Sequence, residues 1–296
     1  MSMNRIVGVV GLGIMGGAIS RNLVAAGWRV LGFDPGEAQR AAATAHGIEA
    51  MDSLAGVAQI APVLITSLPG PGALIATANG LAGLPPRIVV ETSTLTIADK
   101  EAAAAVLLRA GHTPLDCPLS GTGAQAVNKD LVVYASGDTA AIAALQPLFL
   151  DFARDAPDVG VFGNGSRMKF VANLLVAIHN VAAAEAMVLG IRAGLDPEQL
   201  VRLAGGGAGA SRMFTMRAPM MAAGVYEPPT MRISTWQKDM RIIAQFAASV
   251  GAPTPLLDAT APLYDAALAQ GRGEQDTASV YAVMAELALG AAPGTD

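Results

Sequence analysis

Short apolar runs alternate with helix-like stretches through the first half of the chain. The strand-like runs are residues 6–10, 30–33, 63–67, 88–91 and 132–135, and the helix-like stretches include 16–26 and 100–110. The strand-like runs lack apolar–polar alternation, which is typical of strands buried on both faces of a parallel sheet. The pattern therefore predicts an α/β domain with a mostly parallel sheet built from βαβ units.

The character of the chain changes near residue 165. Long stretches of Ala, Leu and Met then dominate, interrupted by residues 205–207 (three glycines) and 227–229 (Glu-Pro-Pro). Glycine and proline clusters of this kind separate helices. We therefore expect two domains, residues 1–164 and an all-helical 165–296, and a disordered tail over 290–296.

Residues 170–191 are almost continuously apolar and long enough to cross a bilayer as a helix. Asn173, His179, Asn180 and Glu185 interrupt this run, and each would be costly in lipid. We therefore expect a central helix buried on all sides, between domains or subunits, and no membrane association.

Amino-acid composition limits the binding partners and the cellular compartment that we expect. Hydrophobic residues make up 52% of the chain and charged residues 15%, which favours a homo-oligomer because a lone chain would expose apolar surface. A net charge of −5 without basic clusters makes nucleic-acid binding unexpected. One cysteine excludes an intramolecular disulfide, and the first residues do not resemble a signal peptide, so we expect a cytoplasmic protein.

A glycine motif follows the first strand-like run directly. It has the spacing G-x-G-x-x-G and comprises Gly11, Leu12, Gly13, Ile14, Met15 and Gly16. The first glycine permits a tight turn, the second lets a pyrophosphate approach the backbone, and the third lets helix and strand pack closely. This position between strand and helix predicts a dinucleotide site.

Asp34 ends the next strand-like run, where a carboxylate accepts hydrogen bonds from ribose hydroxyls. Because a carboxylate repels a 2′-phosphate, NAD is favoured over NADP. Arg40 keeps NADP open, since a guanidinium could reach the same place. A protein that binds the dinucleotide without chemistry would carry the same motif, so catalysis needs other evidence.

Two later segments carry candidate chemistry. Residues 116–123 (Asp-Cys-Pro-Leu-Ser-Gly-Thr-Gly) place Ser120 and small residues in a loop suited to an anion. Lys169 and Asn173 stand four residues apart, hence on one face of an otherwise apolar helix. Together they are better explained as a lysine base beside a hydrogen-bonding amide than as a solvated end and a core amide.

Four segments in this order resemble the β-hydroxyacid dehydrogenase family, which includes 3-hydroxyisobutyrate dehydrogenase and tartronate semialdehyde reductase. They are the glycine motif, the D-x-P-x-S-G-G loop (116–122), the G-x-x-x-K-x-x-x-N helix (165–173) and a late Lys238–Asp239 pair. The resemblance implies Lys169 as general acid/base, with the substrate held by Ser120, Gly121, Thr122 and Asn173. Lys238 would reach cofactor and substrate.

The resemblance also implies a Rossmann-like domain joined by a long helix to an all-helical domain, in dimers or tetramers. Two further cofactor segments follow from it: Ser67, Leu68 and Pro69, and Ser93 with Thr94. Thr122 departs from the family pattern because it stands where the second glycine of S-G-G is usual. A β-branched side chain there narrows the pocket, so the substrate can differ from the best-known ones.

The sequence therefore predicts hydride transfer between NAD or NADP and a small β-hydroxyacid or its semialdehyde or keto form, without a metal. Lys169, partly buried beside a cation such as Lys238, would need a lowered pKa to act as a base near neutrality. A reductase of imines or other carbonyls on the same scaffold is one alternative. A non-catalytic NAD(P)-binding interaction protein is another, disfavoured because Lys169 is present.

Overall fold

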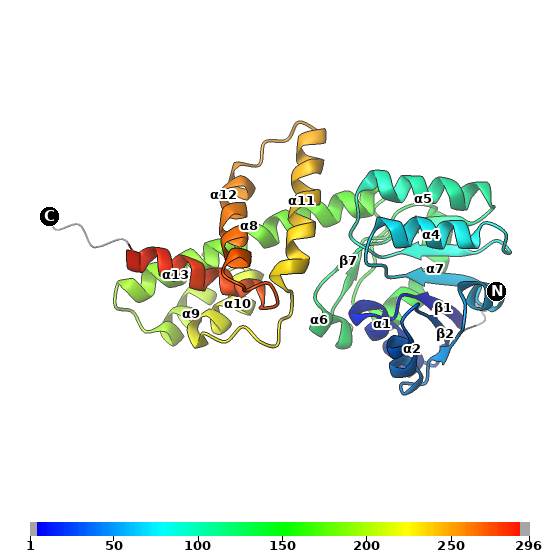
Figure 1. Ribbon diagram of the computed structural model, residues 1–296, viewed down its shortest axis with the longest axis horizontal. Coiled ribbons are helices and arrows are strands. Elements are labelled where there is room, and N and C mark those ends of the chain that lie inside the picture. Colours follow the sequence, from blue (N-terminus) through cyan, green and yellow to red (C-terminus); the bar gives the residue numbers. More distant parts are fainter. Residues whose placement is uncertain (1–4, 291–296) are drawn as a thin grey trace. The chain divides into compact units, whose positions relative to one another are not determined.

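The computed structural model describes residues 5–290, and the chain forms two compact units that divide after Lys169. Residues 291–296, in the tail expected to be disordered, lie outside the described residues. Helix α8 (Asn164–Arg192) begins in the first unit and continues into the second. Each unit is described by itself below (Figure 1).

The first unit is built on a six-stranded parallel sheet with strand order β3-β2-β1-β4-β5-β6. This order reverses direction between β1 and β4, as in doubly wound dinucleotide-binding folds, where ligands bind at the carboxyl ends of the strands. The predicted Rossmann-like α/β architecture is therefore confirmed. The strands are β1 (Ile6–Val10), β2 (Arg29–Phe33), β3 (Glu49–Ala50), β4 (Val63–Thr66), β5 (Ile88–Glu91) and β6 (Thr113–Asp116).

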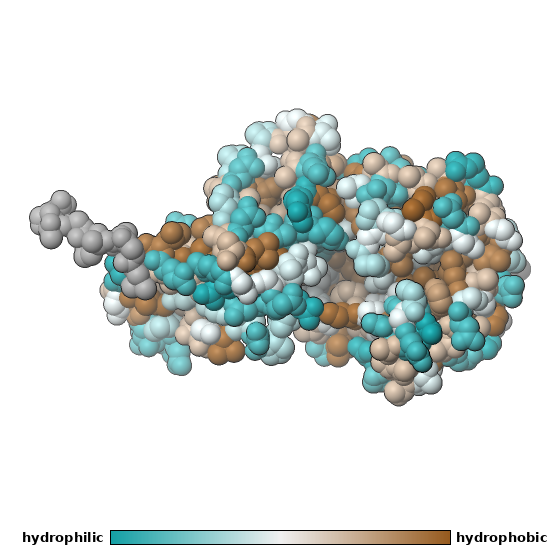
Figure 2. All heavy atoms as spheres, viewed as in Figure 1, coloured by the Kyte–Doolittle hydropathy of each residue, from teal (hydrophilic) through white to brown (hydrophobic). Residues whose placement is uncertain are grey.

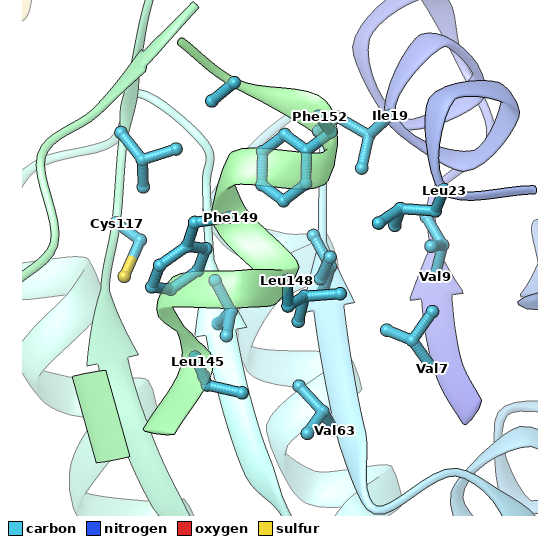
Figure 3. Packing of buried hydrophobic residues seen from close by; sticks show 14 of the residues in the cluster. Val7, Val9, Ile19, Leu23, Val63, Cys117, Leu145, Leu148, Phe149 and Phe152 are labelled. Carbon is cyan, nitrogen blue, oxygen red and sulfur yellow. The ribbon is translucent and has the colours of Figure 1, made fainter. Parts of the chain in front are cut away.

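Helices cover both faces of this sheet. They are α1 (Ile14–Ala25), α2 (Glu37–Thr44), α3 (Leu54–Ile60), α4 (Pro71–Leu81), α5 (Ile97–Arg109), α6 (Gly123–Val127) and α7 (Thr139–Phe152). Successive side chains of a strand enter opposite cores: Val63 and Ile65 pack with α1 and α7, whereas Leu64 packs with α3, α4 and α5. Figure 3 shows the first of these cores, in which Phe149 of α7 lies toward Cys117 and Phe152 lies toward Ile19 of α1.

One predicted strand does not belong to the parallel sheet. The run 132–135 was expected to continue it, but β8 (Val132–Val133) pairs antiparallel with β7 (Leu119–Ser120) in a separate two-stranded sheet. The prediction was wrong because an apolar run indicates burial and not the choice of partner strand. The sixth strand of the main sheet is instead β6, whose residues are Thr-Pro-Leu-Asp.

The second unit is helical. Besides most of α8, it contains α9 (Pro197–Gly205), α10 (Arg212–Ala223), α11 (Ile233–Ser249), α12 (Pro255–Ala269), the 3-10 turn η1 (Thr277–Ser279) and α13 (Val280–Gly290). A buried ion pair joins Arg217 of α10 to Asp276 before η1, with 3.0 Å between Nε and Oδ1. Asp276 also accepts the backbone N–H of Thr230 at 2.7 Å, which fixes the loop before α11.

Helix α8 is less buried than expected. Val171, Leu175 and Leu189 are exposed, the last to 71%. A single chain thus covers only part of a helix that was expected to be buried between domains or subunits. Figure 2 shows further apolar surface on the helical unit around α13, where Leu287 is exposed.

Candidate active site

The glycine motif forms the turn between β1 and α1. Gly11 has φ +89°, and its amide N–H donates to the Phe33 carbonyl at 2.8 Å. A Cβ on Gly16 would lie 1.9 Å from the Gly11 carbonyl oxygen, so only glycine lets the helix begin this close to the strand. The first and third glycines are therefore required by the turn itself.

The middle glycine is different. A Cβ on Gly13 would meet no atom within 4 Å, and Gly13 caps α1 without a side-chain hydrogen bond to the first-turn N–H groups. There is therefore open space beside Gly13, and the first N–H groups of a helix have no acceptor within the helix, a combination that suits a phosphate group. The residues present fit the pyrophosphate of a dinucleotide.

Asp34 follows β2 at the neighbouring strand end. Its carboxylate accepts the backbone N–H of Leu12 and that of Gly36, each at 2.8 Å, and so ties the glycine turn to the β2–α2 loop. Arg40 folds onto the same loop, where Nη1 donates to the Asp34 carbonyl at 2.7 Å. An anion and a cation therefore both lie where the sequence predicts the adenosine ribose.

The two remaining cofactor segments follow β4 and β5, the next strands of the sheet. The backbone N–H of Leu68 donates to Ser93 Oγ at 2.8 Å, which joins the segment Ser67–Pro69 to the segment that contains Ser93 and Thr94. The Ser93 N–H in turn donates to Glu91 Oε1 at 2.9 Å. Hydrogen bonds thus link the two predicted cofactor loops to each other.

The predicted substrate loop runs from β7 into α6. Thr122 caps α6: its Oγ1 lies 3.4 Å from the Gln125 amide nitrogen, and its own N–H donates to Gln125 Oε1 at 3.0 Å. This is a capping box, so the polar groups of Thr122 are engaged with Gln125. Ser120 and Gly121 precede it, and Gly121 has φ +138°.

Lys169 lies near the start of α8, in a part of the helix that packs tightly on the sheet unit. A Cβ on Gly165 would lie 2.5 Å from the Asp116 carbonyl oxygen, and Ser166 donates its N–H to Asp116 Oδ2 at 2.8 Å. Lys169 is 8% exposed and Asn173, four residues on, is 5% exposed. The helix is continuous here, so the two polar side chains share one face, as predicted.

Asp239 belongs to this region, although it was not among the predicted site residues. In the helical unit, Asn173 Nδ2 donates to Asp239 Oδ2 at 3.1 Å, and Lys238 Nζ lies 3.3 Å from Asp239 Oδ1. Asp239 is buried on α11. The adjacent Lys–Asp pair was the available signal, but neighbours in sequence do not reveal a partner on another helix.

The lone cysteine lies in the protein core. Cys117 is fully buried, and burial, with Asp116 beside it, raises the pKa of its thiol. In residues 5–290 no group of three or more His, Cys, Asp or Glu side chains could hold a metal ion.

Helix α8 is long and apolar enough to cross a membrane by length and composition. Its buried Asn180, however, donates to Tyr264 and to the Thr277 carbonyl, as in the core helix of a folded unit.

Two family models together match nearly the whole chain. The model described as the NAD binding domain of 6-phosphogluconate dehydrogenase matches residues 6–164. The model described as NAD-binding of NADP-dependent 3-hydroxyisobutyrate dehydrogenase matches residues 163–284. The first covers the sheet with the glycine motif, and the second covers Lys169, Asn173 and the Lys238–Asp239 pair.

Characterised relatives align over almost their full length. L-threonate dehydrogenase of Cupriavidus necator is 30% identical over 97% of this chain and 98% of its own. 2-(Hydroxymethyl)glutarate dehydrogenase of Eubacterium barkeri is 28% identical over 95% of both chains. These relatives are dehydrogenases named for hydroxyacid substrates.

The solved structures agree. Mycobacterium tuberculosis 3-hydroxyisobutyrate dehydrogenase, solved with L-serine, superposes with a TM-score of 0.86 at 27% identity, covering 94% of this chain and 98% of that chain. A Streptomyces aurantiacus imine reductase shares the fold, with a TM-score of 0.63 at 20% identity and 94% and 99% coverage. Matched domain models and a relative 30% identical along its length show that the chain belongs to the β-hydroxyacid dehydrogenase family of NAD(P)-dependent oxidoreductases acting on CH–OH groups.

Proposed function

We propose that this chain interconverts a small β-hydroxyacid and its semialdehyde or keto form, with Lys169 as the general acid/base. The observation that carries the proposal is the buried polar face of α8, where Lys169 and Asn173 follow each other at one-turn spacing in an apolar helix. A lysine side chain is seldom buried unless it is paired or has a functional role.

The residues divide the work as follows. Ser120 Oγ and the backbone N–H of Gly121 hold the substrate carboxylate, whereas Thr122 shapes the loop because its own donors bind Gln125. Asp239 fixes one N–H of the Asn173 amide, so that the other donates to the substrate oxygen. In the oxidative direction Lys169 Nζ takes the proton of the hydroxyl group, and in reduction it returns that proton. When bound, the nicotinamide accepts or supplies the hydride.

The substrate class is a short acid with a β-hydroxyl group and room for further hydroxyls. Relatives named for L-threonate and 2-(hydroxymethyl)glutarate support a branched or polyhydroxylated acid. A panel of L-threonate, 3-hydroxyisobutyrate, 2-(hydroxymethyl)glutarate, succinic semialdehyde and a cyclic imine, followed by NADH or NADPH absorbance, tests this. Turnover of the imine alone would replace the proposal by an imine reductase.

Lys169→Ala is the decisive variant. We expect kcat to fall by about 10²- to 10⁴-fold, with NADH still bound, because the glycine motif is untouched. Lys129→Ala is the matched control, since Lys129 is an exposed lysine of the same unit and should leave kcat unchanged. Full turnover by Lys169→Ala would show that another group moves the proton.

NAD is the proposed cofactor, supported by the Asp34 carboxylate at the end of β2. Asp34→Asn keeps an acceptor for one of the two backbone N–H groups and removes the charge that repels a 2′-phosphate. We expect the ratio of kcat/KM for NAD over NADP to fall by about tenfold or more. An unchanged ratio, together with a loss of NADP turnover in Arg40→Ala, would instead make Arg40 a 2′-phosphate ligand.

We further propose that the protein is a cytoplasmic homo-oligomer, a dimer or tetramer. The exposed apolar side chains on α8, led by Leu189, support a second copy of the chain as the group that covers them. We also propose that the protein does not bind nucleic acid or a membrane. The net charge of −5 and the buried asparagines of α8 support this proposal.

A further inference from the structure

A fully buried ion cluster lies at the carboxyl ends of β5 and β6. Glu91 and Asp116 are the last residues of these strands and are register partners in the parallel ladder. Lys100 of α5 places its Nζ 2.7 Å from Glu91 Oε2 and 2.7 Å from Asp116 Oδ1. Lys100 is only 2% exposed. Two neighbouring carboxylates are thus bridged by one ammonium away from water.

Each carboxylate of the cluster also holds a different part of the proposed site. Glu91 accepts the backbone N–H of Ser93, whose hydroxyl accepts the N–H of Leu68, so this branch fixes both cofactor loops. Asp116 accepts the N–H of Ser166 at 2.8 Å and its hydroxyl at 2.9 Å. The second branch therefore ends in the first turn of α8, one turn before Lys169.

The ion cluster depends on the positive charge of Lys100. Without it, two buried carboxylates would face each other, and one would have to take up a proton or turn away. Burial lowers the pKa of Lys100, but Glu91 and Asp116 raise it by more, so the ammonium remains charged at neutral pH. A carboxylate that accepts first-turn N–H groups also stabilises a helix N-terminus, as Asp116 does for α8.

We propose that Lys100 is a positioning residue, whose buried ammonium holds Glu91 and Asp116 together and thereby fixes the cofactor loops and the Lys169-bearing turn of α8 as one assembly. The catalytic half of this inference rests on the proposed function of Lys169. Lys100 acts through the two carboxylates that its ammonium binds.

Lys100→Met tests the proposal. A small cavity beside the cluster is lined mainly by apolar side chains such as Leu74, Val89 and Leu107, so a methionine can be accommodated. We expect kcat to fall by about 10- to 100-fold and NADH to bind less tightly. Hydrogen–deuterium exchange, measured without cofactor, should rise in peptides covering 92–95 and 164–170.

Arg217→Met is the matched control. It removes another buried cation from its carboxylate, Asp276, in the helical unit, and we expect it to destabilise the fold to a comparable extent. Both variants are compared at a temperature where each is folded by circular dichroism. If exchange in 92–95 and 164–170, NADH affinity and kcat change equally in both variants, Lys100 is only a structural ion-pair partner and the proposal is overturned.

Ser166→Ala tests the Asp116 branch separately from the Glu91 branch. It also provides a test of the proposal if Lys100→Met does not fold. It removes the hydroxyl bond to Asp116 and leaves the Glu91 branch intact. We expect a lower kcat and faster exchange over 164–170 with unchanged NADH affinity; unchanged kcat and exchange would overturn the α8 branch. A wild-type protein without turnover on the substrate panel would refute the proposed function alone, because exchange and NADH binding are measured without substrate.

Discussion

The glycines of the β1–α1 turn meet two different physical demands. At Gly16 a methyl group would strike the Gly11 carbonyl at 1.9 Å, whereas at Gly13 it would meet nothing within 4 Å. We expect Gly16→Ala to lower the free energy of unfolding by about 1–3 kcal/mol. Gly13→Ala should change it by no more than about 0.5 kcal/mol and yet weaken NADH binding by about tenfold or more, since the methyl occupies phosphate space.

Thermal unfolding and NADH fluorescence titration check this pair. Each variant is the other's control, because the substitution is the same and the positions lie in one turn. If Gly13→Ala bound NADH like the wild type, the open space at the start of α1 would not be the pyrophosphate site.

Cys117 is a buried residue whose chemistry follows from its surroundings. Burial and the adjacent Asp116 raise the pKa of the thiol, so the reactive thiolate is suppressed in the folded protein. We expect no labelling of the native protein by a thiol reagent at mildly alkaline pH and one thiol per chain in denaturant. Rapid labelling of the native protein, with far-UV circular dichroism unchanged, would contradict the burial of Cys117.

At the scale of elements, the strands that could be predicted are those with buried apolar side chains on both faces. Residues 6–10, 63–67 and 88–91 were predicted on that basis and correspond to β1, β4 and β5. β6 was missed because Thr113–Asp116 contains a proline and one large apolar residue, and β3 because it has two residues. The local pattern of apolar and polar residues does not predict such strands, because they form only by pairing with adjacent strands.

The candidate site shows the same limit. The glycine motif and the Lys169–Asn173 face follow from spacing along the chain, which turn and helix geometry convert directly into position. The ion cluster could not be predicted, since Glu91, Lys100 and Asp116 come from three elements and nothing local pairs them. The same holds for Asp239, which meets Asn173 from another helix.

Helix α8 depends on a buried amide in its middle. Asn180 Nδ2 donates to Tyr264 Oη and to the Thr277 carbonyl, each at 2.9 Å. Asn180→Ala should lower the free energy of unfolding by about 1–3 kcal/mol, because buried acceptors lose their donor. Asn79→Ala, an exposed asparagine on α4, is the control and should change it by less than about 0.5 kcal/mol. Equal denaturation midpoints would show that water replaces the Asn180 bonds.

At the scale of the whole molecule, the exposed face of α8 leads to a prediction about assembly. Leu189 is 71% exposed on this helix. We expect light scattering to give at least twice the mass of one chain, and Leu189→Glu to shift the population toward monomer, because a buried carboxylate is costly in an apolar interface. Leu108→Glu, at an exposed leucine of α5, is the matched control and should leave the mass unchanged. A monomeric wild type would refute the proposed oligomer.

The glycine turn and the predicted substrate loop are also joined within the sheet unit. Asn22 of α1 donates to the Ala126 carbonyl of α6 at 2.7 Å, and a Cβ on Gly123 would lie 2.6 Å from the side chain of Ile14. Residue 14 belongs to the glycine motif, whereas residue 123 follows Thr122. For protein engineering, this contact makes the two loops one module: a substrate loop grafted from a relative must bring a compatible residue 14 with it.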